Sequence, residues 1–151
     1  MTDNPEFSLR PARLEDDLTI RRMIRQEHLN PQNLHWPQFT VAIDHNGTMI
    51  GCGQVKIHSE EVHELASLVV HKEWRGKGVA SALINNLIAT HPGVLYLTCR
   101  ASLEPLYEHF GFVSIPLNVM PPNFRSMYRL INGILALFGQ RGGFKVMRRI
   151  P

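Results

Sequence analysis

A strand, a glycine-containing loop and a helix follow one another without interruption between Glu64 and Ala89. The residues from Leu65 to Val70 form a short apolar run that ends in paired valines, which is typical of a strand buried on both faces. Apolar residues then recur at helical spacing, at Val79, Ala82, Leu83, Leu87 and Ile88. The sequence therefore predicts a buried strand that leads through a tight turn into an amphipathic helix.

The loop between them, Arg75-Gly76-Lys77-Gly78-Val79-Ala80, has the chemistry of an anion site. Gly76 and Gly78 allow a sharp turn and a close approach of ligand, because neither carries a Cβ. The loop opens directly into a helix, whose first amide N–H groups lack intrahelical partners at the positive end of the helix dipole. Arg75 and Lys77 add positive charge. We therefore expect this loop to bind a diphosphate.

Two common phosphate-binding loops do not fit this spacing. A Walker A loop requires glycine, four residues and then Gly-Lys-Ser/Thr, which the sequence lacks. The dinucleotide fingerprint GxGxxG requires a third glycine at the place of Ser81. Ordinary loops also place glycines before helices, so the assignment of this loop depends on a second motif elsewhere in the chain.

The segment from Glu64 to Ile84 resembles the signature of the GNAT superfamily of acyl-coenzyme A N-acyltransferases, whose pattern is Gln/Arg-x-x-Gly-x-Gly/Ala. Arg75, Gly78 and Ala80 occupy its specified positions. A second segment, from Leu106 to Phe112, resembles the LYxxxGF motif of the same family. Because both motifs occur in the family's order and separation, the chain is identified as a member of this superfamily, and the resemblance covers most of it.

The resemblance implies an α/β (α+β) architecture, the GNAT fold: a mixed, mostly antiparallel sheet with splayed central strands, flanked by helices. The strand at 68–70 would diverge from the strand at 95–99, and its exposed backbone would hydrogen-bond the pantetheine arm of acetyl-CoA like an added strand. The diphosphate would lie on the glycine loop. The implied residues that bind this cosubstrate are Leu68, Val69, Val70, Arg75, Gly76, Lys77, Gly78, Val79 and Ala80.

The resemblance also implies direct attack of an amine on the thioester of acetyl-CoA. Tyr107 matches the family's usual proton donor to the leaving sulfur, and a purely structural core tyrosine is the alternative. Glu64 aligns with a strand glutamate that serves as general base in several branches. The alternative is that Glu64 belongs, with Glu60 and Glu61, to a polar hairpin end. Arg100 stands where many family members carry an asparagine that contacts the coenzyme, which puts that contact in doubt.

Composition is consistent with one soluble domain over residues 1–151. The net charge of +3 and the pI near 9.1 suit an acidic ligand, but the sequence lacks the dense basic stripe of a nucleic-acid binder. Cys52 and Cys99 are expected to be buried free thiols in a reducing compartment. The acidic, polar N-terminus resembles neither a signal nor a transit peptide, so we expect a cytoplasmic protein.

The remaining elements follow from periodicity and turn residues. Strands are predicted at 7–12, 39–43, 48–57, 93–99, 112–115 and 144–149, and helices at 14–28 and 103–110. The apolar face of the first helix is predicted to comprise Leu14, Leu18, Ile20, Met23 and Ile24. The resemblance implies that the polar segment at 30–37 walls the acceptor site, where His28, His35 and Trp36 are candidates for the lining. Plain packing is the alternative for Trp36.

The segment at 120–143 is an extra C-terminal helical insertion relative to the family. A helix is predicted from Pro121 to about Phe138, ended by Gly139 and the glycines at 142 and 143. Arg125 and Arg129, at i,i+4 spacing, either select a carboxylate-bearing amine or form a solvated basic face. The apolar residues Leu130, Ile131, Ile134, Leu135, Leu137 and Phe138 are expected to pack over the sheet, with a dimer contact or a membrane contact as alternatives.

Three histidines, His58, His63 and His71, lie near glutamates in the sequence. No pair has helical metal-ligand spacing, so we expect no metal and interpret the group as a solvated hairpin rim. The predicted function is an N-acetyltransferase that uses acetyl-CoA and a small-molecule or peptide amine acceptor, with a homodimer left open. The alternatives are a non-catalytic acyl-CoA-sensing module on the same fold and a nucleic-acid-binding protein.

Overall fold

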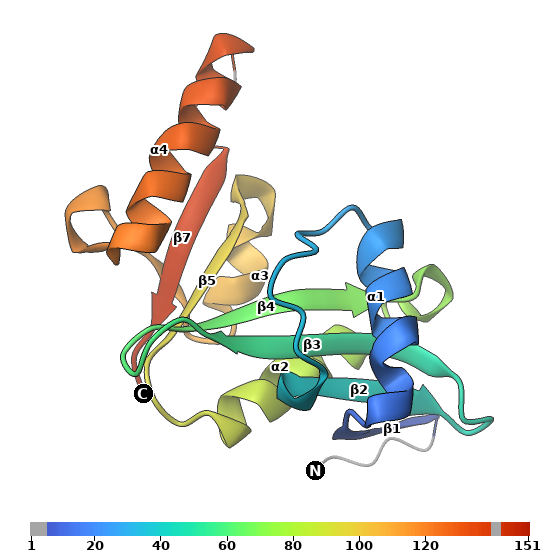
Figure 1. Ribbon diagram of the computed structural model, residues 1–151. Coiled ribbons are helices and arrows are strands. Elements are labelled where there is room, and N and C mark those ends of the chain that lie inside the picture. Colours follow the sequence, from blue (N-terminus) through green and yellow to red (C-terminus); the bar gives the residue numbers. More distant parts are fainter. Residues whose placement is uncertain (1–5, 140–142) are drawn as a thin grey trace. The chain divides into compact units, whose positions relative to one another are not determined.

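The computed structural model describes residues 6–139 and 143–151. In this part of the chain a seven-stranded mixed sheet has the hydrogen-bonded order β1-β2-β3-β4-β5-β7-β6, and most of its pairings are antiparallel (Figure 1). The mixed, mostly antiparallel sheet expected from the sequence is confirmed. The residues form two compact units, the first up to Lys56 with Leu65–Pro92 and the second with Ile57–Glu64 and Gly93–Pro151.

The first unit is built from the antiparallel strands at the N-terminal end of the sheet order. Its elements are β1 (Phe7–Pro11), α1 (Asp17–Gln26), β2 (Phe39–Asp44), β3 (Met49–Ile57), β4 (His63–Val70) and α2 (Val79–Thr90), with the last residue of β3 and the first two of β4 assigned to the second unit. The helix α1 packs on one face of these strands through Ile20 and Ile24, against Val41. The helix α2 packs on the other face through Val79 and Leu83, against neighbours that include Ala42.

The predicted start of the first helix is wrong, and its predicted apolar face is wrong at Leu14 and Leu18, whereas Ile20, Met23 and Ile24 are buried as predicted. A 3₁₀ turn over Leu14–Asp16 precedes α1, and the side chains of Leu14 and Leu18 are 69% and 76% exposed. The cause is Asp16, which is buried and accepts hydrogen bonds from the Arg10 guanidinium at 2.6 and 3.1 Å. This contact fixes the chain just before the helix, so that only the later apolar positions face the strands.

Two glycines let α2 and β4 approach β3 closely. A Cβ at Gly51 would lie 3.0 Å from the Val69 carbonyl oxygen, and a Cβ at Gly53 would lie 3.1 Å from the Leu87 side chain. Both distances are shorter than an ordinary van der Waals contact. Both glycines therefore stand where neighbouring elements approach β3 closely.

The second unit holds the remaining strands and two helices. Its elements are β5 (Leu95–Arg100), α3 (Glu104–Glu108), β6 (Val113–Ser114), α4 (Pro122–Leu137) and β7 (Phe144–Arg149). The strand β7 pairs antiparallel with β5 along its whole length, and β5 meets β4 in parallel where Tyr96 lies opposite Glu64. Phe124 of α4 is fully buried against Val146 and stacks on Tyr96, so α4 covers the face of β5 that carries Tyr96.

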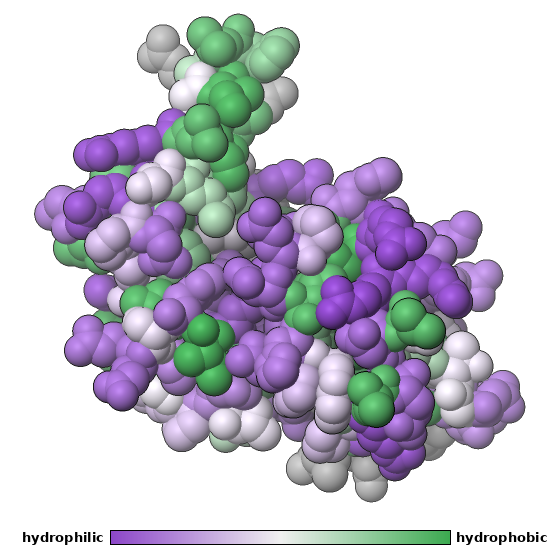
Figure 2. Space-filling model, in the orientation of Figure 1, coloured by the Kyte–Doolittle hydropathy of each residue, from purple (hydrophilic) through white to green (hydrophobic). Residues whose placement is uncertain are grey.

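The second half of α4 does not pack as predicted. Leu130, Ile134, Leu137 and Phe138 have exposed side chains, and Figure 2 shows these apolar groups at the surface. The reason is the length of the strand beneath. Asn132 already caps the first residue of β7 through both backbone groups of Phe144, at 3.1 and 3.2 Å, and the helix continues beyond that point. The expected packing over the sheet is therefore wrong for these four residues.

Several smaller expectations can also be compared with the structure. Cys52 and Cys99 are buried free thiols, as predicted. Trp36 begins a 3₁₀ turn and packs against the core beneath α1, while its place in the lining of the acceptor site stays a prediction. Gly142, one of the residues expected to end the C-terminal helix, lies outside the described residues. Within the described ranges, no helix has the length and apolarity needed to cross a membrane.

Candidate active site

The predicted glycine loop forms a cradle at the start of α2. Gly76 and Gly78 have φ angles of +78° and +86°, in the left-handed region that glycine adopts without strain. Space is open where each Cβ would stand. Gly78 caps the helix without a side-chain hydrogen bond, so the amides of the first turn lack intrahelical acceptors. The backbone therefore presents several N–H groups at the positive end of a twelve-residue helix.

A pocket of about 250 Å³ lies against this loop. Its lining residues are Val70, Trp74, Arg75, Gly76, Gly78, Val79, Ala80 and Ser81. The structure thus gathers the end of β4 and nearly all of the predicted diphosphate-binding residues around one cavity. Lys77, which does not line it, holds its ammonium 4.9 Å from the centre of the Trp74 ring.

The Arg75 side chain is less free than the sequence suggested. Its guanidinium lies 3.2 Å from the Glu27 carboxylate and 3.3 Å from the Val70 carbonyl oxygen. Both charged groups of this ion pair are exposed, so it is worth about 0–1 kcal/mol and an anionic ligand can displace it. We therefore expect an anion at this loop to be held mainly by the backbone amides.

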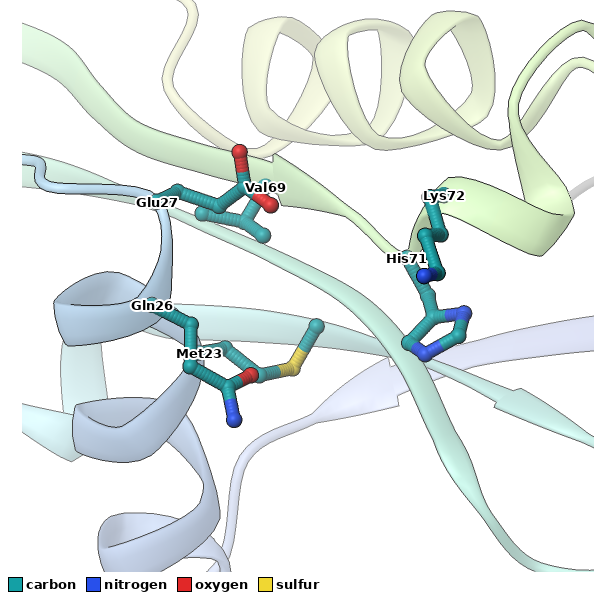
Figure 3. A pocket seen from close by; sticks show the side chains of 6 residues that line it. All are labelled: Met23, Gln26, Glu27, Val69, His71 and Lys72. Carbon is teal, nitrogen blue, oxygen red and sulfur yellow. The ribbon is translucent and has the colours of Figure 1, made fainter.

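A second pocket, of about 350 Å³, lies between α1 and the end of β4. Figure 3 shows its lining, with Met23 and Gln26 on α1, Glu27 just after that helix, Val69 on β4, and His71 and Lys72 in the turn that follows. It shares Glu27 with the ion pair to Arg75. The two pockets therefore adjoin the same end of β4.

The backbone of β4 carries a local irregularity that the sequence did not predict. Ser67 has a φ of +57°, which is unusual for a residue other than glycine. The amide of Gln54 on β3, fully buried, donates to the Ser67 hydroxyl at 2.8 Å and to the Asn33 carbonyl at 3.4 Å. A glutamine among the apolar residues and glycines of 49–55 was the available signal. The predicted pantetheine-binding residues follow directly after this irregular position.

Tyr107 lies in the second unit, on α3. Its ring contacts Phe112 edge-on at 6.2 Å, and its side chain is 8% exposed. Burial, and to a lesser degree the nearby Cys99, raises the pKa of Tyr107 to about 12. In the described part of the chain, no group forms a hydrogen bond with its hydroxyl. The phenol is therefore neutral at physiological pH and its proton is not engaged within the protein.

Glu64 differs in burial from Glu60 and Glu61, with which it could have formed a polar hairpin end. Glu60 and Glu61 are exposed, whereas Glu64 is 8% exposed and accepts a 2.7 Å contact from Nε2 of His58. The His58 ring lies edge-on to Phe124 at 5.8 Å. The interpretation as a solvated rim is therefore wrong for Glu64, which is buried, whereas His58 is exposed as that interpretation expects.

The histidines do not assemble a metal site in the residues described. No group of three or more His, Cys, Asp or Glu side chains comes close enough there to hold an ion. His71 instead accepts the Glu73 amide at 3.3 Å and caps the short turn after β4.

Comparison with known families decides the identity. The sequence model of the family described as "Acetyltransferase (GNAT) domain" matches residues 35–114, more than half of the chain. The chain belongs to the GNAT acetyltransferase family. The match includes Glu64, the glycine loop and Tyr107. No curated protein sequence matches the chain.

Solved structures share this GNAT fold at low sequence identity. N-acetylglutamate synthase from Neisseria gonorrhoeae, complexed with coenzyme A and N-acetyl-glutamate, matches 99% of this chain with a TM-score of 0.75 and 20% identity. Rv2747 from Mycobacterium tuberculosis, in complex with CoA and NLQ, matches 95% of this chain and 99% of its own, with a TM-score of 0.73 and 18% identity. A chain of the NatC complex bound to Gag peptide and CoA matches 97% of this chain over 99% of its own length, with a TM-score of 0.70 and 18% identity. The chain spans 36% and 33% of the two N-acetylglutamate synthase structures that it matches.

Within the second unit, the two proposed catalytic side chains of this GNAT protein lie on different sides of β5. Tyr107 is close to Cys99, whereas the His58–Glu64 pair contacts Phe124, which stacks on Tyr96. Adjacent residues of a strand point to opposite faces, and positions 96 and 99 differ by an odd number. The Tyr107 side chain and the His58–Glu64 pair therefore lie toward opposite faces of one strand.

Proposed function

We propose that this GNAT acetyltransferase moves the acetyl group of acetyl-CoA to a primary amine by direct attack of the amine on the thioester. The observation that carries the proposal is the open cradle at the start of α2, with both glycines in the left-handed conformation. Backbone amides at a helix N-terminus suit the diphosphate of coenzyme A. Structural relatives that were solved with coenzyme A support the same cosubstrate.

The chemistry requires one bond to form and one to break. The amine nitrogen attacks the carbonyl carbon, the new C–N bond forms, and the C–S bond breaks. The amine's proton passes to the His58–Glu64 pair, in which the carboxylate holds Nε2 and leaves the other ring nitrogen as the base. The coenzyme leaves as a thiolate and takes its proton from water.

Tyr107 acts on the departing sulfur in this proposal. Its pKa of about 12 exceeds the thiol pKa of about 8.5 by roughly 3.5 units, which corresponds to about 5 kcal/mol against complete proton transfer. We therefore assign to Tyr107 a hydrogen bond to the developing thiolate. A neutral phenol without a protein partner is suited to that role.

The acceptor is an amine of a small molecule or a peptide. Structural relatives were solved with both kinds of ligand, one with N-acetyl-glutamate and another with a Gag peptide. The chain spans only about a third of the N-acetylglutamate synthase structures, so the likeness does not assign their activity to this protein.

Thiol release from acetyl-CoA in the presence of an amine panel tests the proposal. We expect amine-dependent release, with the acetylated amine identified by mass spectrometry. Binding of coenzyme A without turnover of any amine would instead favour an acyl-CoA-sensing module. Binding of generic DNA with a steep salt dependence, and none of coenzyme A, would favour the nucleic-acid alternative.

A further inference from the structure

Arg125 holds a charge that the described part of the protein does not neutralise. The residue lies near the start of α4 and is half-buried. Its Nη2 donates to the Met120 carbonyl oxygen at 3.1 Å, and its Nε is buried without any hydrogen-bond partner. Among the described residues no carboxylate oxygen lies within 4.0 Å of the Arg125 guanidinium, although Arg10, Arg21 and Arg75 each have one.

Such an arrangement is unfavourable in the protein alone. A guanidinium carries five N–H donors, and burying it without a counter-ion costs free energy that an acidic partner ordinarily offsets. Water does not reach the buried Nε to replace that partner. Arg129, one helical turn further on, is exposed, so water can hydrate its guanidinium. The two arginines, which the sequence pattern treated as one pair, therefore differ in burial.

The surroundings of Arg125 connect it to the proposed proton acceptor. The preceding residue, Phe124, stacks on Tyr96 with 5.6 Å between ring centres and contacts the His58 ring at 5.8 Å. His58 in turn holds Glu64. Arg125 thus extends from the helical turn that packs against the His58–Glu64 pair, all within the second unit.

A second arginine lies on the same face of the sheet. Arg148 of β7 is the register partner of Tyr96, and register partners share a face. It is half-buried, and within the described ranges it too lacks a carboxylate partner. Two unneutralised guanidinium groups therefore border the cluster formed by Phe124 and Tyr96.

We infer that Arg125, assisted by Arg148, binds a carboxylate group of the acceptor, so that the substrates are amines that also carry a carboxylate. The inference rests on the proposed function and makes its substrate class specific. A planar carboxylate accepts two parallel N–H bonds from a guanidinium, which fixes both its position and its orientation. The acceptor would then present its amine to the His58–Glu64 pair and its carboxylate to Arg125.

Matched substrates and matched variants test this assignment. Each amino acid is compared with its carboxamide, which keeps the amine and removes the negative charge. For Arg125→Gln we expect kcat/KM with the amino acid to fall about 10- to 100-fold, mainly through KM, because a hydrogen bond to a charged group is lost. Arg125→Lys is expected to retain part of the activity, and turnover of the carboxamide is expected to be unchanged. Arg129→Gln is the control and is expected to behave as wild type.

Other results would overturn the inference. An equal loss of activity with amino acid and carboxamide would indicate a structural role for Arg125. Circular dichroism would show whether Arg125→Gln is folded. If it is not, the Arg148→Gln variant repeats the comparison of amino acid and carboxamide, and an equal loss there too would overturn the inference. A loss of coenzyme A affinity in Arg125→Gln would assign the guanidinium to a phosphate of the cosubstrate.

Failure of the proposed function is distinguished by calorimetry without turnover. If wild type acetylates no amine, titration of amino acids into the complex with coenzyme A still measures carboxylate binding. Binding that disappears in Arg125→Gln supports the anchor, and binding that persists refutes it.

Discussion

Burial raises the pKa of Tyr107 to about 12, so its phenol stays neutral well above physiological pH. Replacing Tyr107 by Phe removes only the hydroxyl from a ring that packs on Phe112. We expect kcat to fall about 10- to 100-fold, because a hydrogen bond to the developing thiolate is lost, with the affinity for coenzyme A unchanged. Because the pKa of Tyr107 is raised to about 12, wild-type kcat should show no loss from its ionisation below about pH 11.

Thiol release and calorimetry measure these two quantities for Tyr107→Phe. Tyr128→Phe is the control, since Tyr128 lies on α4 against Phe144 and has no assigned role in the chemistry. A Tyr107→Phe variant with wild-type kcat would show that the tyrosine serves packing alone.

Gly51 allows a close approach that any side chain would obstruct. A Cβ at this position meets the Val69 carbonyl oxygen at 3.0 Å, the Val79 side chain at 3.1 Å and the Leu83 side chain at 3.2 Å. We expect Gly51→Ala to lower the free energy of unfolding by about 1–3 kcal/mol, because backbone and core must shift. Urea denaturation measures the change.

The control for Gly51 is a glycine with open space around it. A Cβ at Gly133, within α4, meets nothing within 4 Å. Gly133→Ala should therefore raise the free energy of unfolding by up to about 1 kcal/mol through helix propensity. Equal effects of the two substitutions would contradict the contact argument.

The elements that the sequence predicted best are those whose determinants are local. The bounds of β7 are the predicted 144–149, and β4, the loop and α2 follow one another as the apolar pattern indicated. The exposed half of α4 was not predictable, because an apolar stripe shows which face of a helix can be buried but not how far the strand beneath it extends. The start of α1 was missed for a similar reason, since Asp16 is bound by Arg10 on a different element.

The Asp16 carboxylate joins β1 to the turn before α1. It accepts hydrogen bonds from both terminal nitrogens of Arg10 and, at 2.7 Å, from the Arg13 amide. The pKa of Asp16 is lowered from its ordinary 3.8, and the hydrogen bond from Arg10 is the largest cause. We expect Asp16→Asn to cost about 1–3 kcal/mol of unfolding free energy at pH 7. A lowered folded-state pKa contributes stability that is present above 3.8 and is lost as the pH falls below it.

Denaturation from pH 7 to pH 2 therefore checks the Asp16 prediction. The difference between wild type and Asp16→Asn should shrink as the pH falls. Asp17→Asn is the control, because Asp17 forms an i,i+4 pair with the exposed Arg21 and should change stability by about 0.5 kcal/mol or less. A pH-independent difference for Asp16→Asn would contradict the electrostatic explanation.

At the scale of the whole molecule, the sequence revealed the candidate functional residues of the two units unequally. The glycine loop and Tyr107 belong to short motifs, so they were visible without a structure. The His58 ring, which pairs with Glu64, packs on Phe124 from a distant helix, and Arg125 is isolated because no carboxylate lies near it among the residues that the structure describes. Both are tertiary properties, for which local sequence carries no signal.

We propose that the two units form a single domain over residues 1–151. Independent domains meet in exposed linkers, whereas here two of the crossings between units fall inside strands, in β3 after Lys56 and in β4 after Glu64. A strand cannot be divided without breaking its ladder. We therefore expect one cooperative thermal transition, with equal calorimetric and van't Hoff enthalpies.

Coenzyme A makes this test sharper, because its proposed cradle lies entirely in the first unit. At about 100 times its dissociation constant, a ligand of the native state adds about 2.7 kcal/mol of stability. If the units unfold together, the single transition measured by calorimetry moves as a whole to higher temperature. Two resolved transitions, of which coenzyme A shifts only one, would show that the units are separate domains.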